Sequence, residues 1–198
     1  MATHEAKLGI GNSTGMFFHA PARTALPTYP LEDLDTAWAE VGDISEEGIT
    51  LNFDRSTENL RNWANKIKRT IMTDHSETIA ATIMDTTQEV FETILGADAV
   101  TTTTATSEHG ALVTASLSQN TLPEEEAYLF IMKDDDDAIA IGCTEGQITE
   151  MDSVTFEPGA TINWVPTITA INDGWKIILD DGQTTGEESS SGDEEESS

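Results

Sequence analysis

The 198-residue sequence predicts a mainly β protein with two packed antiparallel sheets, a β-sandwich or barrel-like fold, and one short α-helix at residues 86–95. Three observations predict this fold. Threonine is abundant beside isoleucine and valine, and these β-branched residues favour strands. About eight to ten short segments alternate apolar and polar residues. A single segment has the signals of a helix, which we therefore expect to cover one open end of the sheets.

Residues 1–35 are expected to form an extended N-terminal arm. Three glycines are followed by three prolines in this segment: Gly9, Gly11, Gly15, Pro21, Pro27 and Pro30. The segment is too interrupted for a helix and too rich in proline for a central strand. An ordered arm of this kind must lie on its own body or on a neighbouring molecule.

A β-domain is expected over residues 36–181. It begins with a predicted hairpin, in which residues 38–41 and 48–53 alternate in polarity and residues 45–48 form the turn. Residues 54–76 are expected to form either a short helix or an irregular long loop, because Leu60, Trp63 and Ile67 have helical spacing. Another alternating segment follows at residues 77–84.

The helix at residues 86–95 has signals at both ends. Asp85 is a good N-cap, and Gln88 lies three residues further on, as in a capping box. Gly96 stands at the position where helices often end. One face is apolar and is expected to pack on the sheets: Val90, Phe91, Ile94 and Leu95.

The rest of the domain is expected to consist mostly of strands. Residues 100–109 are polar and suit a loop or an edge. Strands are predicted at residues 112–117, 128–132, 138–143, 147–150, 153–156, 161–171 and 175–179. Residues 182–198 contain Gly, Ser, Glu, Asp, Gln and Thr with no apolar side chain, and are expected to form a solvated acidic tail.

The net charge of -28 and the pI near 4.1 exclude several function classes. No large basic face is available to bind nucleic acid or anionic membranes. The sequence has no secretory signal and no apolar run long enough to span a membrane. Such acidity with few lysines suggests adaptation to high salt, because the Debye length falls to about 3 Å at 1 M.

Five of the nine basic residues lie in one stretch: Arg55, Arg61, Lys66, Lys68 and Arg69. A basic segment in an acidic chain complements the acidic surface of another copy, which predicts self-assembly. The alternative is a basic loop that only lowers local self-repulsion.

No constellation of residues predicts catalysis or a cofactor. The four histidines have no ligand-spaced partners, and each is expected to be a surface residue: His4, His19, His75 and His109. Cys143 is the single cysteine and is expected to be a small core residue. No dinucleotide loop and no nucleophile elbow is present.

Four consecutive carboxylates mark the tip of a predicted hairpin: Asp134, Asp135, Asp136 and Asp137. Most such runs are solvated or lumen-facing charge. They are also the candidates for a cation site, because hard cations prefer oxygen ligands, although the EF-hand spacing is absent. Paired acids for hydrolysis are the third alternative, but such pairs usually come from different strands.

Taken in order, several segments resemble one protein family. They are residues 19–27, 38–42, 44–53, 55–57, Trp63, 69–73, 85–92 with Gly96, Phe130, 146–150 and 162–171. Over about residues 15–181 the chain resembles the major tail tube protein of viruses with long, non-contractile tails. The acidic tail after Gly182 has no counterpart in that pattern.

The resemblance implies a virion structural protein that assembles into hexameric rings, which stack into a hollow tail tube that delivers viral DNA. Residues 54–76 would reach an adjacent ring, which makes Arg55, Arg61, Trp63, Lys66, Lys68 and Arg69 candidate contacts. It also implies tape-measure, tail terminator and distal tail proteins as partners, and DNA that passes without specific binding. The acidic tail and the overall acidity, by composition alone, favour a virus of a halophilic, archaeal host.

A different class of function remains open from the residues alone. A monomeric, salt-adapted β-sandwich that binds a cation or a carbohydrate could use the four aspartates at residues 134–137. The basic segment favours assembly over this alternative, because a monomeric binding module has no need of it.

Overall fold

The computed structural model describes residues 10–11, 17–30, 34–118, 121–134 and 137–181. Its larger sheet has the strand order β3-β2-β8-β9-β10-β5-β4, and all neighbouring strands are antiparallel. These strands are β3 (Ala39–Gly42), β2 (Phe17–Pro21), β8 (Glu126–Asp134), β9 (Asp137–Met151), β10 (Pro166–Ala170), β5 (Ile67–Ile83) and β4 (Ile44–Arg61). Two short strands pair beside this path: β1 (Ile10–Gly11) with β8 and β11 (Lys176–Asp180) with β9.

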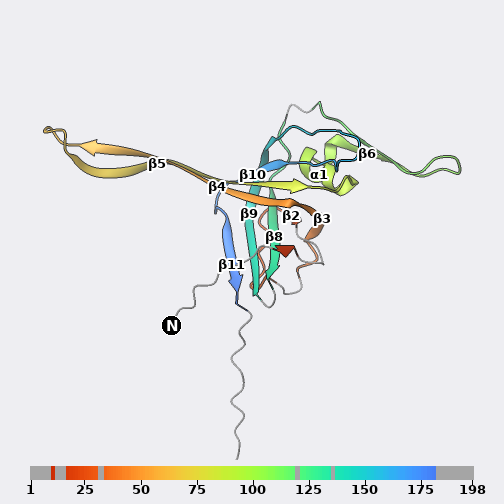
Figure 1. Ribbon diagram of the computed structural model, residues 1–198, viewed down its shortest axis with the longest axis horizontal. Helices are drawn as coiled ribbons and strands as arrows, with labels where there is room; N and C mark the ends of the chain where they lie inside the picture. The colour runs from red at the N-terminus through yellow and green to blue at the C-terminus, as the bar shows by residue number, and fades with distance from the viewer. Residues whose placement is uncertain (1–9, 12–16, 31–33, 119–120, 135–136, 182–198) are drawn as a thin grey trace, which may run out of the picture.

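Strand β9 belongs to both halves of this sheet (Figure 1). Its first part, from Ala138 to Gly142, lies between β8 and β11. Its second part, from Gly146 to Met151, pairs with β10, which leads on to β5 and β4. Both halves contribute side chains to one core, so the predicted mainly β sandwich is confirmed.

The core is centred on aromatic rings from the strands. The rings of Phe17 and Phe130 stack with centroids 4.5 Å apart, and Ile79 and Ile168 from the other half of the sheet are buried in the same cluster. Strand β8 also buries its opposite face, where Leu129 lies in a second cluster. Successive side chains of a strand point to opposite faces, so β8 is apolar at every position from Ala127 to Met132.

Within the N-terminal segment, residues 17–21 form a central strand of the sheet. Strand β2 lies between β3 and β8, with Phe17 opposite Phe130 and Pro21 opposite Glu126. The expectation that this segment is too rich in proline for a central strand is therefore wrong. Pro21 is the last residue of β2, where a missing N–H does not interrupt the ladder. Leu26 and Leu34 then pack on the second cluster.

The predicted hairpin of residues 38–53 is also wrong in its pairing. Both segments are strands, but β3 pairs with β2, whereas β4 pairs with β5. The backbone N–H of Asp43 donates to a carboxylate oxygen of Asp85 at 2.7 Å, and that of Met84 donates to the carbonyl of Asp43 at 3.0 Å. These bonds hold the start of β4 beside the end of β5.

The single α-helix of the described residues, α1 (Gln88–Leu95), begins two residues later than predicted. Thr87 is its N-cap, and the hydroxyl of Thr87 accepts from the N–H of Val90 at 3.3 Å. Asp85 is therefore not the cap. Gly96 ends the helix with φ 89°, as predicted, and the expected apolar face packs on the core. A 3-10 turn, η1 (Ala97–Ala99), follows.

A separate two-stranded sheet is formed by β6 (Val100–Thr103) and β7 (Leu112–Ala115). It projects beyond α1, at the opposite end of the molecule from the long β4–β5 ribbon (Figure 1). The predicted strand at residues 153–156 is absent; that segment is irregular up to a bridge between Trp164 and Ile83. No helix among the residues that the structure describes is long and apolar enough to cross a membrane. The tail at residues 182–198 lies outside the described residues.

Candidate functional site

The distal part of the β4–β5 ribbon is the most exposed feature of the fold. Strand β10 pairs with β5 as far as Thr78, and beyond it residues 53–61 and 67–77 pair only with one another. About eleven residues at about 3.3 Å per residue extend roughly 35 Å from the body. The segment is therefore neither the short helix nor the irregular loop that the sequence left open, but a projecting β-ribbon (Figure 1).

The tip of the ribbon is a defined turn. The N–H of Asn62 donates to the carbonyl of Lys66 at 2.9 Å, and the N–H of Lys66 donates to the side-chain oxygen of Asn62 at 2.8 Å. Asn65 adopts a left-handed conformation with φ 58°, which asparagine tolerates well. The turn presents the side chains between Asn62 and Lys66 to solvent.

The ribbon carries all five residues of the basic segment. Arg55 and Arg61 lie on β4, Lys66 lies in the turn, and Lys68 and Arg69 lie on β5. All five are exposed, and none of them forms a salt bridge with a carboxylate within the described ranges. Residues 54–76 hold five basic and three acidic residues, a net charge of +2, whereas the rest of the chain carries -30.

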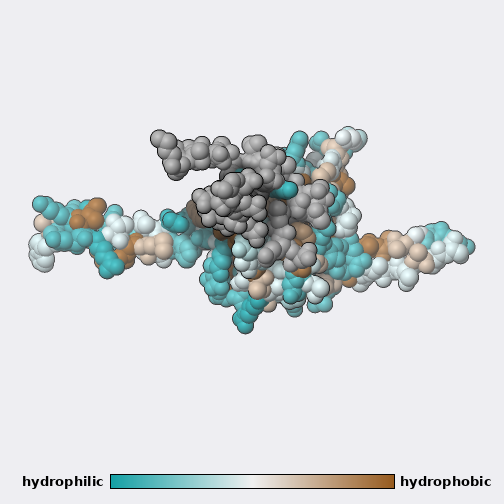
Figure 2. All heavy atoms as spheres, turned by 90° about the horizontal axis from the view of Figure 1, so that it is seen from below, coloured by the Kyte–Doolittle hydropathy of each residue, from teal (hydrophilic) through white to brown (hydrophobic). Residues whose placement is uncertain are grey.

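Exposed apolar side chains accompany these charges. Trp63 at the tip is fully exposed, and Leu60, Ile67 and Met72 are each about half exposed. Figure 2 shows hydrophobic patches interleaved with hydrophilic ones along the ribbon. A surface that combines an exposed aromatic residue with exposed cations is typical of a binding interface.

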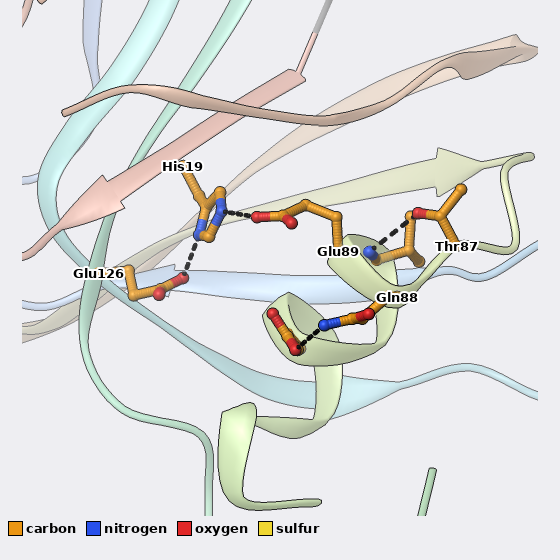
Figure 3. A network of polar contacts seen from close by, with 7 residues as sticks. His19, Thr87, Gln88, Glu89 and Glu126 are labelled. Atoms are coloured by element: carbon orange, nitrogen blue, oxygen red, sulfur yellow. Dashed lines mark hydrogen bonds and ion pairs between the residues drawn. The ribbon is translucent and has the colours of Figure 1, made fainter. Parts of the chain in front are cut away.

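A polar cluster joins three elements of the body (Figure 3). The Nε2 atom of His19 on β2 lies 2.9 Å from a carboxylate oxygen of Glu89 on α1, and its Nδ1 atom lies 3.0 Å from one of Glu126 on β8. Burial disfavours the charged ring, but the hydrogen bonds and charges of Glu126 and Glu89 outweigh it and raise the pKa of His19. His19 is largely buried, so its expected surface position is wrong.

Beside this cluster the surface has an acidic hollow of about 500 Å³ between α1 and residues 121–126. His19 forms part of its wall. The wall also includes four carboxylates and two leucines: Glu92, Asp98, Glu124, Glu126, Leu95 and Leu122. Asp98 and Glu124 are exposed and form no salt bridge in the described part of the chain, so their charges face solvent.

A buried carboxylate, Glu145, is held by another pair of residues. Glu145 on β9 accepts hydrogen bonds from Arg23 and from the side-chain amide of Asn172. The bonds from Asn172 and Arg23 keep the pKa of Glu145 below its usual range. This contact fixes the segment after β2 to the bend of β9 and is structural in character.

The remaining candidates from the sequence are the four aspartates, Cys143 and the other histidines. Asp135 and Asp136 lie outside the described residues, and Asp134 and Asp137 are the facing ends of β8 and β9. No group of three metal-ligating side chains occurs among the residues that were described. Cys143 is buried, as predicted, and burial raises the pKa of its thiol to about 12. His75 and His109 are exposed, and His4 lies outside the described residues.

Comparisons with known proteins add one clear family match. The family model described as phage tail tube protein matches residues 2–174. Among solved structures, the chain is similar to the anti-feeding prophage cap, the cap that terminates its tube, with 12% identity and a TM-score of 0.46. That match covers 90% of this chain and 97% of the cap protein. No curated protein matches significantly.

Proposed function

Because this chain belongs to the phage tail tube protein family and is thus a structural protein of the virion tail, we propose how it builds the tube. Copies assemble into hexameric rings, and the rings stack into a hollow tube that delivers viral DNA. The β4–β5 ribbon reaches from each subunit to the adjacent ring. The observation that carries this proposal is the projecting ribbon with its exposed basic residues and exposed Trp63.

The charge distribution supports contacts between copies. The ribbon carries +2 and the rest of the chain -30, so the ribbon is attracted to any neighbouring body. The candidate contacts are those expected from the sequence: Arg55, Arg61, Trp63, Lys66, Lys68 and Arg69.

Open sheet edges support ring formation. In the described part of the chain, β3 and β11 each pair on one side only. Strand β11 exposes the apolar side chains of Ile177 and Leu179, and an exposed apolar edge strand tends to pair with another chain. Pairing of such edges between neighbouring subunits closes the sheets around a ring.

The acidity of the body suits passive conduction of DNA. A lumen lined by carboxylates repels phosphates, so the polymer slides without being held. The family is structural, and we propose that the protein has no catalytic role. Tape-measure, tail terminator and distal tail proteins are the further partners of the tube in this proposal.

Electron microscopy of the purified chain in high salt tests the proposal. We expect hollow tubes or stackable rings with sixfold symmetry. A strictly monomeric species, even with seeds of pre-formed rings, would overturn it.

The ribbon is tested by reversing Lys66, Lys68 and Arg69 to Glu. We expect subunits that fold and form rings but do not stack. Since all three side chains are exposed, the melting temperature of the monomer should be unchanged. Normal tubes from this variant would remove the ribbon from the interface.

A further inference from the structure

The ribbon requires an acceptor surface on the next copy, and an acidic protein offers many carboxylates. We propose that the ribbon tip of one copy docks into the acidic hollow between α1 and residues 121–126 of the copy in the adjacent ring. This inference rests on the proposed function and names the partner surface of the ribbon. Three observations distinguish the hollow from the rest of the acidic surface.

The first observation is that the ribbon tip and the hollow carry opposite charges. The tip presents Lys66, with Lys68 and Arg69 behind it, and the hollow presents exposed Asp98 and Glu124 beside Glu92. Neither set is neutralised by salt bridges within the described residues of one molecule. The attraction between the basic tip and the acidic hollow therefore strengthens when contact between them excludes water.

The second observation is complementary apolar surface. The ribbon tip carries the fully exposed Trp63, and the hollow contains the exposed Leu122 and the half-buried Leu95. These two leucines also border an apolar recess with Ile148 and Met151. A volume of about 500 Å³ is ample for an indole ring and its neighbours. Trp63 would be the aromatic anchor and the carboxylates the polar rim.

The third observation is position. Strand β5 starts at the ribbon tip and ends next to α1, so the tip and the hollow lie toward opposite ends of the long axis (Figure 1). A contact between two different surfaces at opposite ends is a head-to-tail contact, which can repeat from copy to copy along one axis. Stacking of rings requires a contact of this kind.

A charge exchange tests the proposed pair of surfaces. One variant carries Asp98→Lys and Glu124→Lys, a second carries Lys66→Glu and Lys68→Glu, and a third combines all four changes. Assembly is measured by sedimentation and electron microscopy at the lowest salt at which wild-type tubes persist. We expect each double variant to form at least about tenfold fewer tubes than the wild type. A tenfold change corresponds to about 1.4 kcal/mol in the free energy of assembly. The combined variant should recover most of the tubes.

A matched control changes the charge equally at another exposed place. Glu46→Lys and Glu47→Lys alter two carboxylates on β4 that do not line the hollow. This control should assemble like the wild type. The melting temperature of each monomer shows whether the subunit is folded.

The outcomes separate this inference from the proposed function. Tubes from the Asp98 and Glu124 variant, with none from the Lys66 and Lys68 variant, would overturn the acceptor site and leave the ribbon in the interface. Loss in both double variants without recovery in combination would also overturn it. Tubes from the Lys66 and Lys68 variant would contradict the role of the ribbon itself.

Crosslinking of wild-type tubes gives a test that needs no variant. A carbodiimide joins an amine to a carboxylate only when they are in contact. We expect peptides that link Lys66 or Lys68 to Asp98 or Glu124, in tubes and not in monomers. Links from these lysines to other carboxylates alone would place the acceptor elsewhere.

Discussion

The ring of His19 lies 2.9 Å from the carboxylate of Glu89, although 70 residues separate them in the sequence. The same ring contacts Glu126, 107 residues away from it. One side chain therefore connects strands β2 and β8 with helix α1, beside the hollow that we propose as an acceptor.

The first prediction concerns the pH dependence of this cluster. Because the pKa of His19 is raised in the folded state, its contribution to stability is fully present below its unfolded value of about 6.5 and is lost as pH rises through the folded pKa. His19→Gln should lower the free energy of unfolding by about 1–3 kcal/mol at low pH and by less at high pH. Urea unfolding of the monomer between about pH 6 and pH 9 measures this difference.

The exposed His75 provides the control for that experiment. His75→Gln should leave the free energy of unfolding unchanged within about 0.5 kcal/mol at every pH. A constant cost of His19→Gln across the range would show that the ring acts by packing alone.

The second prediction separates folding from assembly at Trp63. This side chain is fully exposed, so Trp63→Ala should change the free energy of unfolding by less than about 0.5 kcal/mol. As an interface anchor, Trp63 should contribute about 2 kcal/mol to the free energy of assembly. Its loss in Trp63→Ala should therefore raise the concentration needed for tubes about thirtyfold. Sedimentation over a dilution series measures that concentration. Phe156→Ala, at another exposed aromatic residue, should leave it unchanged unless exposed aromatics contribute in general.

The third prediction concerns salt. The body carries -30 and the ribbon only +2, so repulsion between bodies outweighs the attraction of the ribbon when charges are unscreened. Dilution from about 1 M to about 0.1 M salt lengthens the Debye length from about 3 Å to about 10 Å. We expect tubes to loosen, as followed by light scattering. Tubes that are indifferent to this dilution would count against adaptation to high salt.

The fourth prediction concerns close packing at the bend of β9. A Cβ atom at Gly142 would lie 2.6 Å from a methyl carbon of Leu26 and 3.0 Å from the backbone oxygen of Tyr128. Gly142→Ala should therefore lower the free energy of unfolding by about 1–3 kcal/mol. Thermal unfolding should show a fall of about 2–4 °C per kcal/mol.

Gly110 is the matched control for this substitution, because nothing lies within 4 Å of a Cβ there. Gly110→Ala should leave the melting temperature unchanged. Equal effects of the two substitutions would show that backbone freedom matters more than the contact with Leu26.

The sequence could predict where most strands lie but not which strands pair. Alternation of polarity is a local signal, so both β3 and β4 could be recognised from residues 38–53. Their partners depend on contacts far along the chain, such as the bond from Asp43 to Asp85. The helix was visible because its apolar face and its terminal Gly96 are local signals too, and only its first residues were misplaced.

The site was predictable in part for the same reason. The basic segment is contiguous in the sequence, but its ribbon conformation was not apparent, because a strand with two solvated faces has no period-two pattern. His19 and Glu145 carry no local signal at all. Their partners Glu89 and Asn172 come from distant elements, and a single histidine or glutamate resembles any surface residue until the fold is known.

Strand β9 has a consequence for the order of events during synthesis. Neither half of the sandwich can close without it, and it ends at Met151, about three quarters of the way along the chain. The ribbon leaves the ribosome much earlier, while its own body still lacks β9, β10 and β11. Contacts distant in sequence form slowly, so the nascent chain offers no finished subunit to its neighbours. Growth of a polymer is thereby deferred until β9, β10 and β11 have been synthesised.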